Sequence, residues 1–388
     1  MKRLISILMI LFLSVSLNGC SLFSSFFEDK PYGQFTIWAD GVYYPYLNDV
    51  AKKFMQHNKL IEIEVKLVDS ENYIVKYLKN KVNKSVDMPS AVVLKGSSML
   101  NVYKDNKDSF RNVNSEIFEL SSSYTESRVH EVKINKNMYG IPLSSSPMVL
   151  VIDEKKLIEY GYTKENLKTW EDVCTVGSEI YSKSNGKDVL FKMNKQQCIE
   201  LFEILVMQLK NNDEYFYLSD YNSTISRAKL IINNLKTKHA LQITEKSSNS
   251  VAGIGTYKDI IELSGKNNDK EYVVTNVPAA NIGGNTFVSG EGSNLIVTEQ
   301  SENISGLVQF LKYLSTDKNA IEGLKEYNIF PALRNVYNIK LFDKKYSAFK
   351  DDKVLSRLSS IALKEDVVYN KMEIVNYIKD NYDSLIGK

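Results

Sequence analysis

Hydrophobic and polar positions in the first third of the chain predict strands and helices in alternation. The apolar run of residues 34–40 (QFTIWAD) ends in a turn signal, which is typical of a strand. Residues 45–54 place apolar side chains at helical spacing behind a proline, and residues 61–67 alternate apolar with charged positions. A helical pattern over 73–82 and a short apolar run over 91–94 follow. This order predicts a mostly parallel sheet covered by helices on both faces.

The pattern changes near residue 140 and indicates a second structural unit. A turn signal at 139–142 (YGIP) and a polar step at 144–146 precede an apolar strand over 148–152. Beyond it the chain is predicted to be mainly helical, with further strands on either side of the glycine-rich loop 283–292. The predicted helices are 170–181, 195–210, 225–235, 305–314 and 319–327, with three more helical segments to the end. A chain of this length exceeds what one hydrophobic core usually supports, so we expect two lobes.

The amino terminus has the layout of a secretory signal. Lys2 and Arg3 precede an apolar stretch over 4–17, which is too short to span a bilayer, where about 20 residues are needed. The following residues, LNGC, resemble the bacterial lipobox, in which cleavage falls before the cysteine and that cysteine carries the lipid. We therefore expect a lipoprotein signal peptide over 1–19 and a lipidated tether over 20–32, anchored through Cys20. An ordinary signal peptide with an incidental cysteine is the alternative.

Removal of residues 1–19 takes away one lysine and one arginine, so the formal charge falls from +2 to 0. A neutral chain has no net field that would attract nucleic acid or an anionic surface, and we expect no nucleic-acid partner. The other two cysteines, Cys174 and Cys198, both lie in predicted helices. Export permits them to form a disulfide, whereas buried free thiols are the alternative, and their spacing decides neither.

Local motifs of common hydrolases and redox enzymes are missing from the sequence. It contains no HExxH, CxxC or G-x-S-x-G, and the S-x-x-K matches at 184–187 and 315–318 lack the motifs that accompany a serine nucleophile. We therefore expect no catalytic residue, no metal and no cofactor. A glycosidase needs only two carboxylates about 5–10 Å apart, and the sequence leaves that possibility open.

Tyrosines lie beside polar residues in the predicted loops that lead from strands into helices. Aromatic rings stack on the apolar faces of sugars while neighbouring polar groups bind the hydroxyls, although such rings also pack at the edges of lobes. Trp38 lies inside a predicted strand and Trp170 at a helix start, and we expect both in the core. The candidate sugar-binding pairs are Asp40 with Tyr43 and Tyr44, and Thr256 with Tyr257.

The segment 139–180, YGIPLSSSPMVLVIDEKKLIEYGY…LKTWEDV, resembles the hinge segment of family 1 extracellular solute-binding proteins. These are the sugar-binding subunits of ABC importers and include the maltose- and glycerol-3-phosphate-binding proteins. A Gly-Ile-Pro turn, a polar step, a strand, a short acidic-basic helix and a Lys-Thr-Trp-acidic-acidic helix start follow in the family's order. Further similar stretches cover nearly the whole mature chain: IWAD, DMPSAVV, VAGIGTYKDI, GGNTFVSGEGSNLIV, SGLVQFLKYLSTDKNA and YNIFPALRN.

The resemblance implies an α/β, two-lobed fold like that of type II periplasmic binding proteins. Each lobe would be a mostly parallel sheet flanked by helices, and a three-segment hinge with crossings near Ser145, Val277 and Ser315 would join them. Lobe one would comprise 33–147 plus 277–315, and lobe two 148–276 plus 316–388. The ligand contacts that the resemblance implies are Asp40, Tyr43, Ser97, Ser98, Ser145, Ser146, Tyr257, Ser293, Asn294 and Arg334.

The function that the resemblance implies is a binding protein and not an enzyme. A lipid-anchored monomer on the outer face of the bacterial cell membrane would capture a carbohydrate or related polyol and deliver it to the transmembrane subunits of an ABC permease. Two alternatives are a surface glycosidase and a carbohydrate sensor or adhesin without a role in transport.

Overall fold

The computed structural model describes residues 31–80, 88–210, 218–245, 250–266, 270–299, 301, 304–338, 345–350 and 353–386. The predicted signal peptide, Cys20 and nearly all of the predicted tether lie outside the described residues. Within these ranges, no helix has both the length and the apolar character that a membrane span requires.

A five-stranded sheet forms the first lobe. Its strand order is β2 (Ile61–Leu67), β1 (Gly33–Ala39), β3 (Ala91–Lys95), β14 (Ser293–Val297) and β6 (Gly140–Pro142). The first three strands are parallel, as the alternation of strands and helices predicts, whereas β14 runs antiparallel to both of its neighbours. In the edge strand β2, buried isoleucines and a valine alternate with exposed glutamates, so only one side chain in two faces the core.

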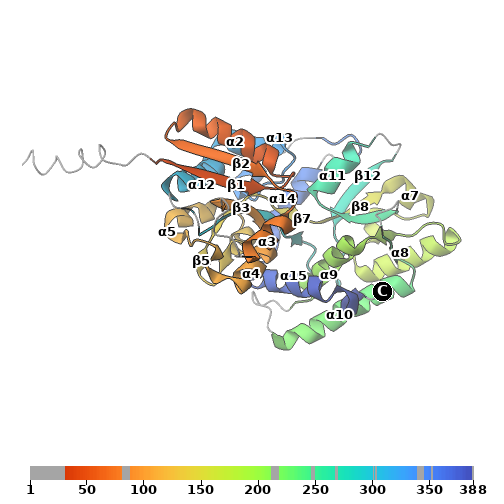
Figure 1. The fold of residues 1–388 in the computed structure, drawn as a ribbon. Coiled ribbons are helices and arrows are strands. Elements are labelled where there is room, and N and C mark those ends of the chain that lie inside the picture. The colour runs from red at the N-terminus through yellow and green to blue at the C-terminus, as the bar shows by residue number, and fades with distance from the viewer. Residues whose placement is uncertain are drawn as a thin grey trace, which may run out of the picture.

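Helices cover both faces of this sheet (Figure 1). α2 (Tyr44–His57) begins with a proline in its first turn and packs with α12 (Ile304–Thr316) and α13 (Lys318–Glu326). α3 (Glu71–Lys79) and α4 (Gly96–Asp105) pack together against β3. The shorter elements that follow are η1 (Lys107–Ser109), α5 (Asn114–Ile117), η2 (Phe118–Ser123), α6 (Glu126–His130), β4 (Lys133–Ile134) and β5 (Asn137–Met138).

The second lobe is built on a smaller sheet with the order β11 (Ala252–Gly255), β8 (Val149–Asp153) and β12 (Tyr272–Asn276). The prediction of a mostly parallel sheet is wrong for this lobe, because the central strand β8 runs antiparallel to both neighbours. β8 enters directly from the first lobe, whereas β11 and β12 are joined through α11 (Tyr257–Ser264) and share one direction. A separate parallel pair is formed by β9 (Phe191–Met193) and β10 (Leu241–Ile243).

The helices of the second lobe pack on its strands and on one another. α9 (Lys195–Leu209) is buried over most of its length and packs against α10 (Leu218–Thr237), which also contacts α8 (Trp170–Lys183). The remaining elements are α7 (Glu154–Glu159), η3 (Lys164–Asn166), η4 (Arg334–Asn338), α14 (Val354–Lys364), α15 (Lys371–Asp380) and α16 (Tyr382–Ile386). Both tryptophans are buried, which confirms their predicted place in the core, and Cys174 and Cys198 are free thiols.

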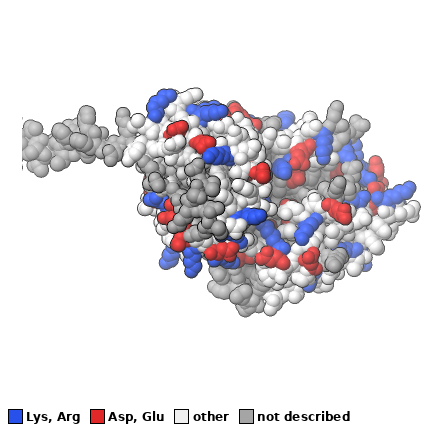
Figure 2. Space-filling model, viewed as in Figure 1, with Lys and Arg blue, Asp and Glu red and all other residues white. Residues whose placement is uncertain are grey.

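The chain passes between the lobes at a short antiparallel ladder. β7 (Ser146–Pro147) leads from the first sheet to the second and pairs with β13 (Ser289–Gly290), which leads back. The return crossing lies later than expected, because Val277 and Val288 both pack in the core of the second lobe. The face shown in Figure 2 carries acidic and basic side chains interspersed over both lobes.

The expected assignment of 316–388 to the second lobe differs from the packing. Ala320 and Leu324 of α13 lie in the same buried cluster as the first sheet, and the Tyr46 hydroxyl donates to the Ala320 carbonyl oxygen. Ser315 is also buried there, where its hydroxyl shares a hydrogen bond with Tyr124. The chain therefore stays with the first lobe beyond residue 316, because the apolar face of α13 is covered by α2. The other expected lobe boundaries stay predictions.

Candidate functional site

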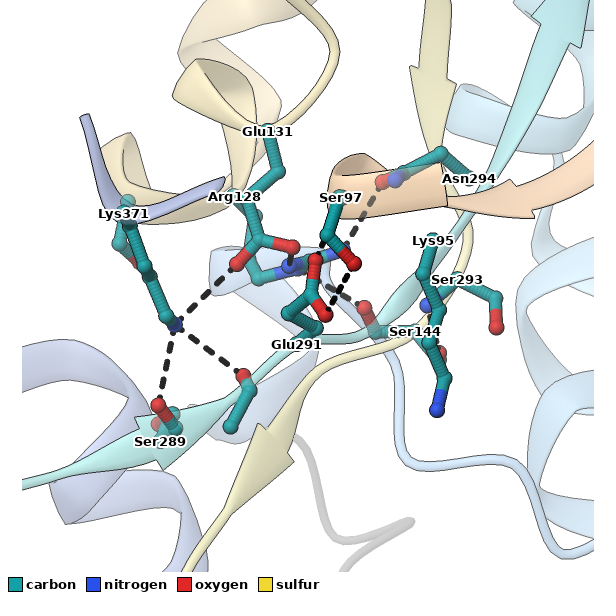
Figure 3. Close-up of polar contacts among 12 residues, drawn as sticks. Lys95, Ser97, Arg128, Glu131, Ser144, Ser289, Glu291, Ser293, Asn294 and Lys371 are labelled. Carbon is teal, nitrogen blue, oxygen red and sulfur yellow. Dashed lines mark hydrogen bonds and ion pairs between the residues drawn. The ribbon is translucent and has the colours of Figure 1, made fainter. Parts of the chain in front are cut away.

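Several predicted site residues gather where the first sheet faces the second lobe. Tyr43 follows β1, Ser97 follows β3, and Ser293 and Asn294 begin β14, which runs in the opposite direction. The carboxyl ends of β1 and β3 and the start of β14 therefore meet at one edge. Figure 3 shows the polar contacts at this edge, which is where open α/β sheets bind ligands.

Ser144, beside the predicted site residue Ser145, joins two of these segments. Its hydroxyl shares a 2.7 Å hydrogen bond with the Tyr43 hydroxyl and accepts one of 2.9 Å from the backbone N–H of Ser293. Burial raises the pKa of Tyr43, so the phenol remains neutral and able to donate. The position of Tyr43 is thus set by the segment through which the chain leaves the first sheet.

Arg128, on α6, is fully buried behind this edge and was not predicted as a site residue. It forms an ion pair with Glu131 and donates from Nε to the Ser144 carbonyl oxygen at 2.9 Å. Its Nη2 donates to the Asn294 side-chain oxygen at 2.8 Å, and the Asn294 amide donates to the Leu94 carbonyl oxygen at 3.2 Å. In this conformation both the oxygen and the nitrogen of the Asn294 side chain take part in structural hydrogen bonds.

Gly292 permits the close approach of the β14 segment to this arginine. A Cβ at this position would lie 2.0 Å from the Ser144 carbonyl oxygen and 2.7 Å from Arg128 Nη2. Neither is an acceptable distance for a carbon atom. The glycine-rich loop that the sequence marks before β14 therefore has a packing role here.

Ser97 is also completely buried, and it is hydrogen-bonded to the carboxylate of Glu291. Its backbone N–H donates to Glu291 Oε1 at 2.6 Å and its hydroxyl to Glu291 Oε2 at 2.7 Å. Lys379 Nζ, on α15, reaches the same Oε2 at 3.1 Å. Burial disfavours ionisation of Glu291, but the Lys379 charge and the Ser97 hydrogen bonds outweigh it, so its pKa is lower than usual.

Lys95, at the end of β3, introduces a positive charge beside the edge. Burial alone would lower its pKa, but the carboxylates of Glu71, Glu291 and Glu200 contribute to raising it. Glu200 is on α9 of the second lobe, and burial raises the pKa of its carboxyl. Charged side chains from both lobes therefore act on one another at this edge.

Other predicted residues lie close by but face structural partners. Asp40 accepts hydrogen bonds from the N–H groups of Val42 and Tyr43, which closes the turn after β1. The Ser145 N–H donates to the Phe330 carbonyl oxygen, and Ser146 is part of β7. Ser98 is half-buried in the first turn of α4.

Tyr257 and Arg334 are not part of this polar group. Tyr257 is only 6% exposed, and its ring packs on Phe330 with 5.6 Å between the ring centres. Its hydroxyl also accepts a 3.1 Å hydrogen bond from Tyr346. Tyr257 thus packs in an aromatic cluster, whereas Arg334 is exposed on η4.

Sequence reasoning missed the charged residues that organise this edge: Arg128, Glu131, Glu291, Lys371 and Lys379. Glu291 offered the clearest signal, because it stands between two glycines directly before β14. Arginine is rare in this chain, and this rarity was the sequence signal that could have indicated Arg128. Among the described residues, no group of three or more histidines, cysteines or carboxylates has the geometry of a metal site.

A second feature of interest is a groove of about 680 Å³ in the second lobe. It lies between α8 and α10 and is lined in part by Trp170, Cys174 and Ile231. The predicted ligand residues do not line it. The polar edge of the first sheet therefore remains the candidate site.

Comparison with known proteins gives a consistent result. The family model described as "Bacterial extracellular solute-binding protein" matches residues 49–350. The fold is similar to that of the sugar-binding protein MalE of Xanthomonas citri, with a TM-score of 0.69, 14% identity and coverage of 91% of this chain and 92% of that one. No curated protein sequence gives a significant match.

Two further solved structures are similar over most of their length. An ABC substrate-binding protein of Listeria monocytogenes in complex with cycloalternan has a TM-score of 0.67 and 14% identity, covering 92% of this chain and 94% of that one. UgpB of Mycobacterium tuberculosis in complex with glycerophosphocholine has a TM-score of 0.64 and 12% identity, covering 90% and 99%. At these identities the likeness shows the fold, which confirms the expected two-lobed class.

Proposed function

The chain belongs to the bacterial extracellular solute-binding proteins, and we propose that it captures a carbohydrate or related polyol between its lobes for delivery to an ABC permease. The family consists of binding proteins. Two of the structural neighbours are named as sugar-binding or were solved with a carbohydrate. A third was solved with glycerophosphocholine, which contains a polyol.

The observation that carries the proposal is the gathering of polar groups from both lobes at one edge of the first sheet. Tyr43 and Lys95 lie at this edge in the first lobe, and the carboxylate of Glu200, on α9 of the second lobe, contributes to raising the pKa of Lys95. Hydroxyl, ammonium and carboxylate groups supply both donors and acceptors, which is what a ligand rich in hydroxyl groups requires. A ligand that contacts both lobes favours the conformation in which both contacts are made.

We propose that the predicted residues act in ligand binding, some by direct contact with the ligand and others by supporting the residues around it. Tyr43, Ser97 and Ser98 lie at the carboxyl ends of β1 and β3 and suit a ligand that enters there. Asn294 supports the ligand site indirectly, because it holds Arg128 in place. The Tyr257 ring packs on Phe330, and the Phe330 carbonyl oxygen accepts a hydrogen bond from the Ser145 N–H in the hinge segment. Tyr257 would therefore affect ligand binding indirectly, through this aromatic cluster.

We further propose that the mature protein is a monomer tethered to the outer face of the cell membrane by lipid on Cys20. The proposal rests on the LNGC sequence behind a basic and then apolar start. Cys20→Ala should leave the protein unprocessed or release it into the medium. A variant that stays in the membrane fraction at its mature size would contradict the anchor.

A thermal-shift screen of the mature protein against sugars, sugar phosphates and polyols tests the proposed ligand class. A ligand that binds only the folded state at 100 times its Kd adds about 2.7 kcal/mol of stability, so a true ligand shifts the melting temperature clearly. Assaying each oligosaccharide for new reducing ends separates binding from glycosidase activity. Binding without a co-purifying permease would instead favour a sensor or adhesin.

A further inference from the structure

α15 contacts both lobes and begins beside the hinge strand β13. Its Met372 side chain packs in the core of the first lobe, whereas Ile374 and Ile378 pack in the core of the second. Near the start of the helix, Lys371 donates to the carbonyl oxygens of Ser289 and Gly290, which form the hinge strand β13. Eight residues later, at Lys379, the helix has advanced about 12 Å along its axis.

The far end of α15 is bonded to the start of α4. Lys379 Nζ donates to the Ser97 hydroxyl at 3.0 Å and to Glu291 Oε2 at 3.1 Å. The Asn376 amide donates to the Ser97 carbonyl oxygen at 3.1 Å. These contacts join α15, which packs partly in the core of the second lobe, to the start of α4 in the first lobe and to Glu291, the residue that follows the hinge strand β13.

The Glu291 carboxylate takes the position that a ligand oxygen would need. It accepts both the backbone N–H and the hydroxyl of Ser97, so both of the Ser97 donors at the start of α4 are taken. Ser97 has no exposed surface, and the side chain of Glu291 is 5% exposed. A ligand can bond to Ser97 only after Glu291 has moved away.

We propose that Glu291, Ser97 and Lys379 form an interlobe clasp, which holds the lobes together without ligand and competes with the ligand for Ser97. The competition between Glu291 and the ligand for Ser97 rests on the proposed function, whereas the contact that holds the lobes together does not. If only the unclasped fraction of molecules binds, the apparent Kd equals the intrinsic Kd divided by that fraction. The clasp therefore reduces affinity and prevents weak ligands from occupying the site.

The test compares the unliganded protein with variants that lose one part of the clasp. Lys379→Met removes the ammonium and keeps the length of the side chain, and Asn376→Ala removes only the amide. The matched control is Lys183→Met, which removes an exposed ion pair with Glu179 within α8. Melting curves establish that each variant is folded, and small-angle X-ray scattering then gives its radius of gyration.

We expect Lys379→Met to have a larger radius of gyration than the native protein and the control, with a smaller increase for Asn376→Ala. The ratio of closed to open molecules should fall by about tenfold or more in Lys379→Met, as expected for hydrogen bonds to charged groups. Equal radii in the native protein and both folded variants would overturn the clasp.

Calorimetric titration with the carbohydrate found in the screen tests the competition. Lys379→Met should bind it more tightly than the native protein does, and unchanged or weaker binding would overturn the competition. The two proposals fail differently. An opened variant with no carbohydrate bound contradicts the proposed ligand, whereas carbohydrate binding with an unchanged radius contradicts the clasp.

Discussion

Glu203, on α9, is a buried carboxyl whose ionisation should control stability as a function of pH. Its side chain is 4% exposed, and its Oε1 atom has no hydrogen-bond partner among the described residues. Burial raises its pKa to about 8, with Lys371 and Lys379 of α15 opposing the rise and Glu291 and Glu200 adding to it. Replacing it in Glu203→Gln keeps the shape of the neutral carboxyl and removes its ionisation.

The sign of the effect follows from the two pKa values. Below pH 4.5 the carboxyl is protonated in both the folded and the unfolded states, so it costs nothing. Between pH 4.5 and about 8 only the unfolded state has lost the proton, and the free energy of unfolding falls by about 1.36 kcal/mol per pH unit. The loss reaches at most about 5 kcal/mol near pH 8 and then stays constant.

Urea unfolding of the native protein and Glu203→Gln at pH 5, 7 and 8, followed by circular dichroism, measures this difference directly. The variant should be nearly as stable as the native protein at pH 5 and more stable by several kcal/mol at pH 8. Glu179→Gln is the control, because Glu179 is exposed on α8 and its pKa is lowered. If the free energies of unfolding of the native protein and Glu203→Gln differ by the same amount at all three pH values, the pKa of Glu203 is not raised in the folded state.

Three substitutions test the packing of the candidate site, each by denaturant unfolding without ligand. Arg128→Met leaves Glu131 buried with less compensation and should cost about 3–5 kcal/mol, whereas the exposed control Arg227→Met should change little. Tyr257→Ala should lower the free energy of unfolding by about 3 kcal/mol and Tyr257→Phe by only about 1, because the ring is buried in the aromatic cluster. An unchanged free energy of unfolding for Tyr257→Ala would place that ring at the ligand surface instead. Gly292→Ala should destabilise the protein and Gly253→Ala much less, since a Cβ at Gly253 meets no atom within 4 Å; equal effects would contradict the close approach to Arg128.

Local patterns predict most of the elements but not all of their pairings. The spacing of apolar residues in α2 and the alternation in β2 reflect burial along one element, so both are legible in the sequence. The antiparallel direction of β8 depends on where the chain enters the second lobe, which no local pattern records. The place of α13 in the first lobe likewise depends on its contact with α2.

The candidate site was predicted in part because the strand ends that build it are visible in the sequence. Tyr43 and Ser97 follow strands that the pattern marks, and both lie at the expected edge. Their partners were not predictable, because Glu291 is 194 residues from Ser97 and Arg128 is 166 residues from Asn294. Tyr257 begins a helix beside a polar residue, as a sugar-stacking ring would, yet residues far along the chain cover it.

Calorimetric titration of the mature protein with the carbohydrate or polyol that most raises its melting temperature measures the proposed ligand binding itself. We expect one bound ligand per chain, a negative heat capacity change as apolar surface is buried on binding, and no new reducing ends afterwards. Failure of every sugar, sugar phosphate and polyol in the panel to bind, or cleavage of the ligand during the titration, would contradict it.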